Sequence, residues 1–418
     1  MSAKNFSRQA ILGALFLVFA LFSSPVAMAL SIERVTSPGG IEAWLAHDAS
    51  VPIISVEIAF RESGSAADPE GKEGLAFLAS GLLDEGAGDL DSQAFRRALE
   101  ENAISLSFDT GHDDFTGSLR TLRKNHEQAF DLLRLALSKP RFDADAVERI
   151  RNQVLTIIAQ RADDPDAVVQ RTWLNAMFPD HPYGRPRYGT PASVKGITAK
   201  DLHDFVDRLL AREKLIIGVS GDITAEELAP LLDRVFGALP ERQSKTTPLA
   251  KPEVKGEGKT IIVEKPIPQS IVLFGGVGLK RNDPDYYVAH VMNYLLGGGL
   301  YSRLSQAIRV DRGLAYSVYT YLYPLDEIGL LVGQVATRND RVEESMELVR
   351  AEWKRMAKEP VSEEELQDAK TYLTGAFPLS LDNTSRIAGV LVAIQQYNLG
   401  IDYIDRRNAY IESVTAED

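Results

Sequence analysis

The two halves of the chain carry the same order of sequence patterns, and this repeat constrains the fold more than any other feature. In the first half, Asp68-Pro69 precedes an apolar helical pattern that runs to Leu82-Leu83, and in the second half Asp283-Pro284 precedes one that runs to Leu295-Leu296. Later matches are Asp143 with Ser362, and residues 197–201 with residues 414–418. Matched positions lie 213 to 219 residues apart, so we expect two domains of one design.

Strand patterns in each half come as meanders followed by runs of helical patterns. Ile53–Phe60 alternates apolar residues with small or polar ones, which is typical of a strand with one buried face. The other strands expected in the first half are Ile41–Ala46, Ile104–Asp109, Phe115–Leu122 and Lys214–Ser220. The segregation of strands from helices predicts an α+β fold, in which each domain has a mostly antiparallel sheet with helices packed on one face.

Helix starts in the first half are marked by capping residues. Asp143 is expected to cap a helix that runs to Arg161, and Thr224 with Glu227 forms a capping box for the last helix of this half. The other expected helices are Glu73–Leu83, Asp91 or Ser92 to Glu101, Asn125–Ser138, Ala167–Met177 and Thr198–Leu210.

Leu239–Gly258 is rich in proline, glycine and charge and has no apolar period, so we expect a linker there. The chain then divides into an N-terminal segment 1–29, a first domain 30–238 and a second domain 259–418. The second half stops before the helix, strand and final helix that close the first half. We therefore expect a second domain truncated at its C-terminus, and whether the natural chain continues past Asp418 stays open.

The first 29 residues have the features of a secretory signal peptide. Lys4 and Arg8 precede an uncharged apolar run over residues 10–22, and Ala27-Met28-Ala29 is a small-x-small cleavage site. The run is too short to cross a bilayer comfortably, and no later run reaches spanning length. We expect an exported protein without a stable membrane span, periplasmic if the source is a Gram-negative bacterium. A retained N-terminal anchor is the alternative.

The charge of the chain restricts its partners. The formal net charge is −13, and removal of the N-terminal segment, which carries two cations and no acid, makes it −15. Such acidity argues against nucleic acid and anionic membrane surfaces as partners. It is compatible with basic peptides or with a less acidic protein.

Residues that could perform catalysis are few. The chain has no cysteine, which excludes disulfides, thiolate zinc sites and cysteine catalysis. Its six histidines include no pair at helical ligand spacing, so no compact zinc-binding set is present. His112, beside Asp113 and Asp114, is the least ordinary of them, but its position at a strand edge favours a solvated cluster. There is also no Gly-x-Ser-x-Gly elbow for serine chemistry.

Residues 297–319 predict a glycine run, a short helix, a tight turn and a strand. Gly297-Gly298-Gly299 lacks the spacing of phosphate-binding loops, so a flexible loop beside a cleft is the better interpretation. Ser302 can cap the short helix by accepting from its free backbone N–H groups. The apolar side of this helix comprises Leu304, Ala307 and Ile308.

Arg309 ends this helix, and Tyr316 follows seven residues later at the start of the strand. A planar cation and a phenol that converge from two elements suit a peptide carbonyl or a carboxylate. An ordinary surface arginine beside a half-buried tyrosine is the alternative.

With the repeat, the linker and this Arg/Tyr spacing, the chain resembles the pitrilysin/insulinase family of zinc metallopeptidases. It is most similar to the two-domain subunits of the mitochondrial-processing-peptidase type. The similarity covers nearly all of the chain after residue 29. It is strongest over residues 295–317 and over Phe178–Thr190, which contains His181-Pro182-Tyr183-Gly184. The resemblance implies two homologous domains that form half of a clamshell and act on a peptide.

The chain departs from the family at the catalytic signature, His-x-x-Glu-His on the first long helix with a distant glutamate as third ligand. Phe77 and Gly81 occupy the histidine positions, and Ser80 occupies that of the general base. The third ligand falls near Ile157. None of these side chains can hold zinc or activate its water, and Phe77 and Ile157 would instead form an apolar plug. We expect no metal and no cofactor in this chain.

In the family, an Arg/Tyr pair holds the substrate backbone and stabilises the oxyanion, and Arg309 and Tyr316 match that pair. The resemblance therefore implies the non-catalytic, substrate-binding subunit of an exported heterodimeric zinc endopeptidase. Arg309 and Tyr316 would act in trans on peptide bound at the zinc site of a paralogous partner subunit. Gly297, Gly298 and Gly299 would flex to admit substrate, although they could equally serve only the turn.

Two other functions stay open. One is a structural or peptide-binding scaffold without a peptidase role, like the core subunits of the respiratory cytochrome reductase, which resemble the same fold. The intact Arg309/Tyr316 pair argues against it, because a scaffold does not need the pair. The other is an autonomous peptidase with an unrecognised site. The sequence does not indicate the peptide cleaved or the identity of the partner.

Overall fold

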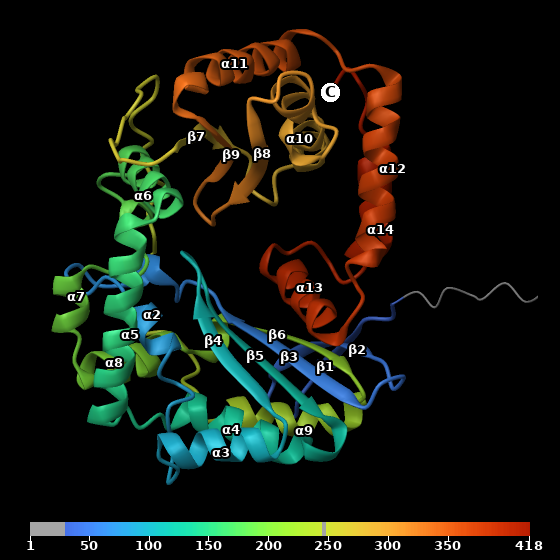
Figure 1. Cartoon of the computed structure of the whole chain (residues 1–418). Coiled ribbons are helices and arrows are strands. Elements are labelled where there is room, and N and C mark those ends of the chain that lie inside the picture. Colours follow the sequence, from blue (N-terminus) through green and yellow to red (C-terminus); the bar gives the residue numbers. More distant parts are fainter. Residues whose placement is uncertain (1–29, 245–247) are drawn as a thin grey trace, which may run out of the picture. The chain divides into compact units, whose positions relative to one another are not determined.

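The structure is a computed structural model that describes residues 30–244 and 248–418 (Figure 1). The predicted signal peptide, residues 1–29, lies outside the described residues. Residues 32–418 form one unit that contains two sheets and the helices packed on them. Within the described ranges, no helix combines the length and the apolar character needed to cross a membrane.

The larger sheet has six strands in the order β1-β2-β6-β3-β5-β4. They are β1 (Glu33–Thr36), β2 (Glu42–His47), β3 (Ile53–Phe60), β4 (Ser105–Thr110), β5 (Phe115–Leu122) and β6 (Leu215–Gly221). All neighbouring strands are antiparallel except β2 and β6, which run parallel. The expected strands and the mostly antiparallel α+β class are therefore confirmed.

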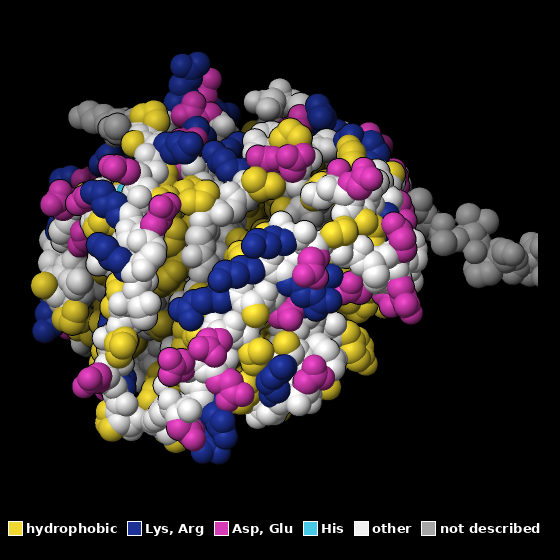
Figure 2. Space-filling model, turned by 90° about the horizontal axis from the view of Figure 1, so that it is seen from above, with side chains coloured by type: hydrophobic (Ala, Val, Ile, Leu, Met, Phe, Trp, Pro, Cys, Tyr) yellow, Lys and Arg dark blue, Asp and Glu magenta, His cyan; other side chains and the backbone are white. Residues whose placement is uncertain are grey.

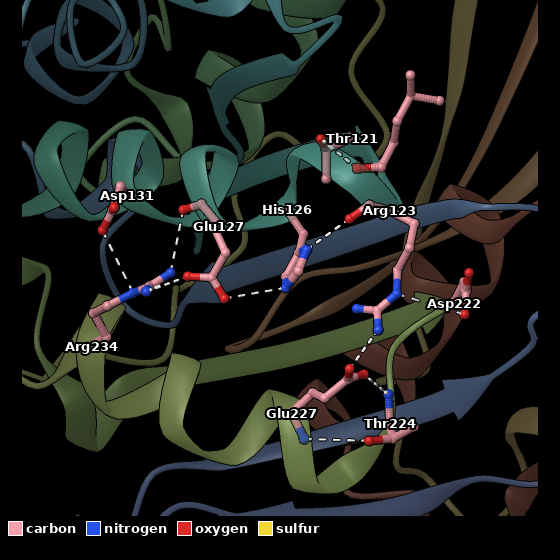
Figure 3. A network of polar contacts seen from close by, with 10 residues as sticks. Thr121, Arg123, His126, Glu127, Asp131, Asp222, Thr224, Glu227 and Arg234 are labelled. Carbon is pink, nitrogen blue, oxygen red and sulfur yellow. Dashed lines mark hydrogen bonds and ion pairs between the residues drawn. The ribbon is translucent and has the colours of Figure 1, made fainter.

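Helices α3 (Ser92–Glu101), α4 (His126–Ser138) and α9 (Ala225–Phe236) lie below this sheet in Figure 1. Figure 3 shows the polar contacts beside α4 and α9, where Arg234 donates to Glu127 at 2.6 Å and Arg123 donates to Glu227 at 2.5 Å. Glu227 also closes the predicted capping box with Thr224. Exposed pairs of this kind contribute about 0.2–1 kcal/mol each, so they orient the helices more than they stabilise them.

The remaining helices of the first half are α2 (Leu75–Ser80), α5 (Ala144–Asp163), α6 (Pro165–Met177), α7 (Pro191–Gly196) and α8 (Ala199–Leu209). Two expectations need correction. Asp143 stands at the N-cap position of α5, but its carboxylate binds Arg141 at 2.6 Å instead of the helix N–H groups. Helix α2 starts later than predicted, because Asp68 accepts from the backbone N–H groups of Gly74, Leu75 and Ala76 and thereby fixes the helix start.

The smaller sheet has three antiparallel strands in the order β7-β9-β8. They are β7 (Gln269–Gly278), β8 (Ala315–Pro324) and β9 (Gly329–Arg338); the helices of this half are α10 (Tyr286–Asn293), α11 (Val342–Lys358), α12 (Glu363–Leu379), α13 (Thr384–Gln396) and α14 (Tyr403–Glu412). The order β7, α10, β8, β9, α11, α12, α13 repeats β3, α2, β4, β5, α4, α5, α6, except that α3 stands between α2 and β4 where the second half has two π-helical turns. The predicted repeat is therefore present. The described part of the linker contains no helix or strand, and the domain limits stay a prediction.

Helix α13 belongs to the second half of the chain but packs on the sheet of the first half. It contacts β6, β3 and β2, on the face opposite α4 and α9 (Figure 1). Ser55 on β3 is therefore buried, and its hydroxyl lies 2.7 Å from that of Thr384. The prediction of a single buried face for Ile53–Phe60 was wrong, because the covering helix lies more than 300 residues away in sequence.

Helix α6 does the reverse: it belongs to the first half of the chain and packs on the sheet of the second half. It contacts β7, and its Leu174 and Met177 share a buried cluster with Leu330 and Val332 of β9. Each half therefore covers part of the other's sheet.

The contact between α13 and β6 can be tested at Gly218. A Cβ atom there would lie 2.3 Å from the carbonyl oxygen of Ala388, so Gly218→Ala must displace the α13 backbone. We expect a loss of about 1–3 kcal/mol in the free energy of unfolding, measured by urea titration. Gly196→Ala is the control, because a Cβ there meets nothing within 4 Å. Equal stability of the two variants would show that α13 does not depend on close packing at Gly218.

Candidate functional site

Aromatic and cationic side chains cover helix α2 at the position where the family binds zinc. Phe77 on α2 lies edge-on to Tyr188, with ring centres 4.6 Å apart. The guanidinium of Arg161 lies 4.6 Å from the centre of the Tyr188 ring and that of Arg187 lies 5.2 Å from it. Tyr188, which the sequence analysis missed, packs on Phe77, and the expected part of Ile157 in an apolar plug stays a prediction.

These residues do not fit a catalytic zinc ion. The Ser80 hydroxyl is buried and donates to the carbonyl oxygen of Phe77 at 2.8 Å, so it is engaged within its own helix. Gly81 directly follows α2 and offers no ligand atom in a side chain. Across residues 30–244 and 248–418, no three His, Asp or Glu side chains are grouped so that they could hold a metal ion. No catalytic step can be assigned to a metal held at this position.

The structure brings Arg309 and Tyr316 together as predicted. The guanidinium carbon of Arg309 lies 5.3 Å from the centre of the Tyr316 ring. Both side chains are exposed, Tyr316 by 85%. A cationic guanidinium and a neutral phenol, both able to donate hydrogen bonds, are therefore exposed side by side on the second half.

The local backbone geometry brings the side chains of Arg309 and Tyr316 close together. Ser305–Val310 is a π-helical turn, in which the N–H of Asp311 donates to Gln306 at 2.9 Å. After the turn, the chain reverses at Gly313, whose φ of +60° favours glycine, and the N–H of Leu314 donates back to the carbonyl oxygen of Ile308. Tyr316 is the extra residue of a β-bulge between Ala315 and Ser317, which redirects its side chain relative to the strand.

An ion pair with α12 holds the turn that carries Arg309 in place. Arg303 is buried and makes two parallel hydrogen bonds of 3.0 Å each to Glu365, at the start of α12. The guanidinium lowers the pKa of Glu365 to about 2. A bidentate, partly buried pair of this kind fixes orientation. The sequence analysis assigned no role to Arg303, although it stands in the motif that carries the family resemblance.

Two other predictions for this stretch are confirmed. The hydroxyl of Ser302 accepts from the N–H of Ser305 at 3.4 Å, and the buried residues of the turn include Leu304, Ala307 and Ile308.

The glycine run does not form the loop beside a cleft that was expected: Gly297 and Gly298 belong to a helical turn, and none of the three glycines is among the residues that line the cavity described below. Tyr294–Gly298 is a second π-helical turn. A Cβ atom on Gly297 would lie 2.5 Å from the hydroxyl of Thr320 on β8, so this glycine permits a close approach of two backbones. The role of Gly297, Gly298 and Gly299 in substrate binding stays a prediction.

A cavity of about 960 Å³ lies elsewhere in the unit. Its wall includes Arg61, Asp113, Lys280, Asp326 and Glu327, but none of the predicted site residues. The cluster beside His112 borders it and is not solvated, contrary to the sequence-based expectation. His112 and Asp114 are buried, and burial lowers the pKa of His112 to about 4 and raises that of Asp114 to about 7.

Sequence comparison shows what this architecture is related to. Residues 45–191 match the family described as insulinase (peptidase family M16), and residues 196–373 match the peptidase M16 inactive domain. A non-peptidase homolog, YmxG from Helicobacter pylori, is 30% identical over 336 residues, which cover 80% of this chain and 77% of that protein. The chain belongs to the M16 family.

Other M16-related sequences carry a peptidase name. An uncharacterised zinc protease of Mycobacterium leprae is 29% identical over 361 residues, covering 86% of this chain and 81% of that protein. The inactive-domain match and the replaced metal ligands place this M16 chain among the non-catalytic homologues.

Solved structures agree with the assignment. The peptidase M16 inactive domain from Pseudomonas fluorescens superposes with a TM-score of 0.84 at 27% identity, covering 93% of each chain. Complex III2 from Candida albicans contains a chain with a TM-score of 0.74 at 15% identity, covering 93% of this chain and 91% of that one; at this identity the likeness shows the fold alone.

The absence of metal ligands at α2 gives a direct prediction. After purification without chelator, the wild-type chain should hold zinc far below one equivalent, because Phe77, Ser80 and Gly81 offer no suitable ligand. The variant Phe77→His/Gly81→His introduces two imidazoles one helical turn apart and should retain more zinc. Atomic absorption of dialysed samples compares the two. A full equivalent in the wild type would mean that a metal site exists elsewhere in the chain.

Proposed function

We propose that this M16 chain is the non-catalytic, substrate-binding subunit of a zinc endopeptidase formed by two paralogous chains. The observation that carries the proposal is the exposed pair, with Arg309 5.3 Å from the Tyr316 ring, on a chain whose own α2 has no metal ligand. A cation and a phenol that face outward can act on a peptide bound to another chain.

In this proposal the pair performs two tasks. Arg309 donates a charge-assisted hydrogen bond to a carbonyl of the bound peptide and so positions its backbone. The Tyr316 hydroxyl donates to the oxyanion that develops on the scissile carbonyl. The partner subunit supplies zinc and the general base. The pairing of Arg303 with Glu365 supports the positioning role, because it holds the turn that carries Arg309.

The surface is compatible with a protein partner. On the face drawn in Figure 2, positive and negative side chains are interspersed and hydrophobic side chains show between them. Around the pair, Leu300, Tyr301 and Val310 are exposed. Mixed polar and apolar surfaces of this kind suit a protein or peptide better than a polyanion.

Export is part of the proposal and rests on the sequence of residues 1–29. Fractionation of Gram-negative cells should place the mature chain in the periplasm, with an N-terminus after Ala29. A cytoplasmic chain that keeps Met1 would contradict the export step alone and leave the trans-acting pair untouched.

Mixing tests the subunit assignment. The purified chain should lack peptidase activity, and activity should appear when a zinc-bearing M16 paralogue from the same organism is added. Size-exclusion chromatography should show a complex of the two. A homo-oligomer that ignores the paralogue would favour the scaffold function instead.

The role of Tyr316 has its own test. Tyr316→Phe removes one oxyanion donor and should lower kcat of the mixed complex by about a hundredfold, with a smaller effect on KM. Tyr319→Phe is the matched control, since Tyr319 lies three residues along the same strand and is 40% exposed. Turnover that is the same in both variants would exclude Tyr316 from the reaction.

A further inference from the structure

The tips of two hairpins, one from each half of the chain, are joined through carboxylates. The N–H of Asp326, between β8 and β9, donates to the carboxylate of Asp113, between β4 and β5, at 3.1 Å. The hydroxyl of Tyr183 donates to the other oxygen of Asp113 at 2.5 Å and accepts from the N–H of Glu327 at 3.2 Å. The bond between Asp326 and Asp113 connects residues 213 positions apart in the chain.

A third carboxylate stands behind this joint. Asp114 is only 8% exposed, and its Oδ2 accepts from the side-chain amide of Gln396 at the end of α13. Its Oδ1 has no hydrogen-bond partner in the described part of the chain. Among the residues described, no cation forms an ion pair within 4.0 Å of Asp113, Asp114 or Asp326, although all three are buried or half-buried.

Backbone hydrogen bonds and burial hold both hairpin tips in place, so neither tip can easily move its carboxylates away from those of the other. The carbonyl oxygen of Asp113 accepts from the N–H groups of Ser63 and Gly64, both at 3.0 Å, and that of His112 accepts from Ala66 at 2.8 Å. In the other tip, Leu325 and Ile328 are buried in the cluster shared with α6. Charge repulsion between the tips must therefore be relieved by protonation or by movement of one tip against the other.

We infer that Asp113, Asp114 and Asp326 form a proton-operated latch between the two hairpin tips. The hydrogen bonds from Tyr183 and from the N–H of Asp326 favour the ionised form of Asp113, but burial and the charges of Asp326 and Glu327 outweigh them. The tips stay joined while the cluster holds protons, and the joint loosens when all of its members ionise. Asp113 and Asp326 also line the cavity of about 960 Å³, so opening of the latch would change both the charge and the accessibility of that cavity.

The surrounding charges only partly offset the burial of the cluster. Arg61 favours ionisation of Asp114, whereas Glu327 opposes ionisation of Asp113. Arg61, Lys214 and Lys280 favour ionisation of Asp326, but Lys214 is itself paired with Glu62 at 2.5 Å, and Glu62 opposes ionisation. Arg187 lowers the pKa of His112, which already falls through burial, so His112 stays neutral above pH 5.

Two phenols also face the carboxylates. Burial raises the pKa of Tyr183 and of Tyr397. Tyr183 therefore keeps the proton that it donates to Asp113 throughout the range in which the carboxylates titrate.

The direction of the pH effect follows from linkage. Burial raises the pKa of Asp113 to about 6 and that of Asp114 to about 7, and also raises that of Asp326. The closed latch therefore binds protons that an opened, hydrated latch releases. Its contribution to stability is complete at acidic pH below the ordinary carboxylate value and is lost as the pH rises through 6 to 7.

Hydrogen exchange of the full chain tests the latch. After correction for intrinsic rates, amide exchange in residues 110–115 and 324–329 should increase about tenfold per pH unit between pH 5 and 6 for each proton released on opening. Asp114→Asn should flatten this dependence, because the amide cannot ionise. Asp340→Asn, just beyond the other end of β9 and exposed, should keep the wild-type profile.

If Asp114→Asn does not fold, Asp326→Asn is used instead. Asp326 is only half-buried, and its replacement also removes one carboxylate of the cluster. A pH profile of either variant that matches the wild type would overturn the latch. The latch would also be overturned if amide exchange in the wild type did not depend on pH, or if Asp340→Asn lost the pH dependence as Asp114→Asn does.

Discussion

The exchange of α6 and α13 between the two halves is the constraint on which the rest of the structure depends. Helix α13 covers the open face of the larger sheet, and α6 packs on the smaller one. Because burial of apolar surface is the main favourable term in folding, neither half completes its core without the other. The exchange also fixes the hairpin tips, since Tyr183 and Gln396, close to the two exchanged helices, both bind carboxylates between the tips.

The sequence predicted what depends on neighbouring residues. Thr224 and Glu227 form the expected capping box, and strands β3 and β5 have the expected bounds. It failed where a distant segment decides the environment. Ser55 and His112 have patterns typical of half-exposed positions, but α13 covers Ser55, and the rings of Tyr183 and Tyr323 pack on His112. Periodicity carries no information on such contacts.

The same distinction applies to the candidate site. Arg309 and Tyr316 are only seven residues apart, so their approach could be predicted from the helix end and strand start that the sequence indicates. The loss of zinc ligands at α2 could likewise be inferred residue by residue. Tyr188 and Arg303 could not be found in this way: Tyr188 covers Phe77 from a loop more than 100 residues away, and Arg303 binds Glu365 from 62 residues away. Both act through partners that only the folded chain identifies.

The π-helical turn before Arg309 also makes the site sensitive to chain length. A π-helical turn contains one residue more than the α-helical turn it replaces, and each residue of an α-helix rotates the next side chain by about 100°. Loss of a single residue between Ser305 and Val310 would let the turn relax to α-helical geometry and point the guanidinium away from the phenol. The pair is thus vulnerable to a one-codon deletion that alters neither Arg309 nor Tyr316.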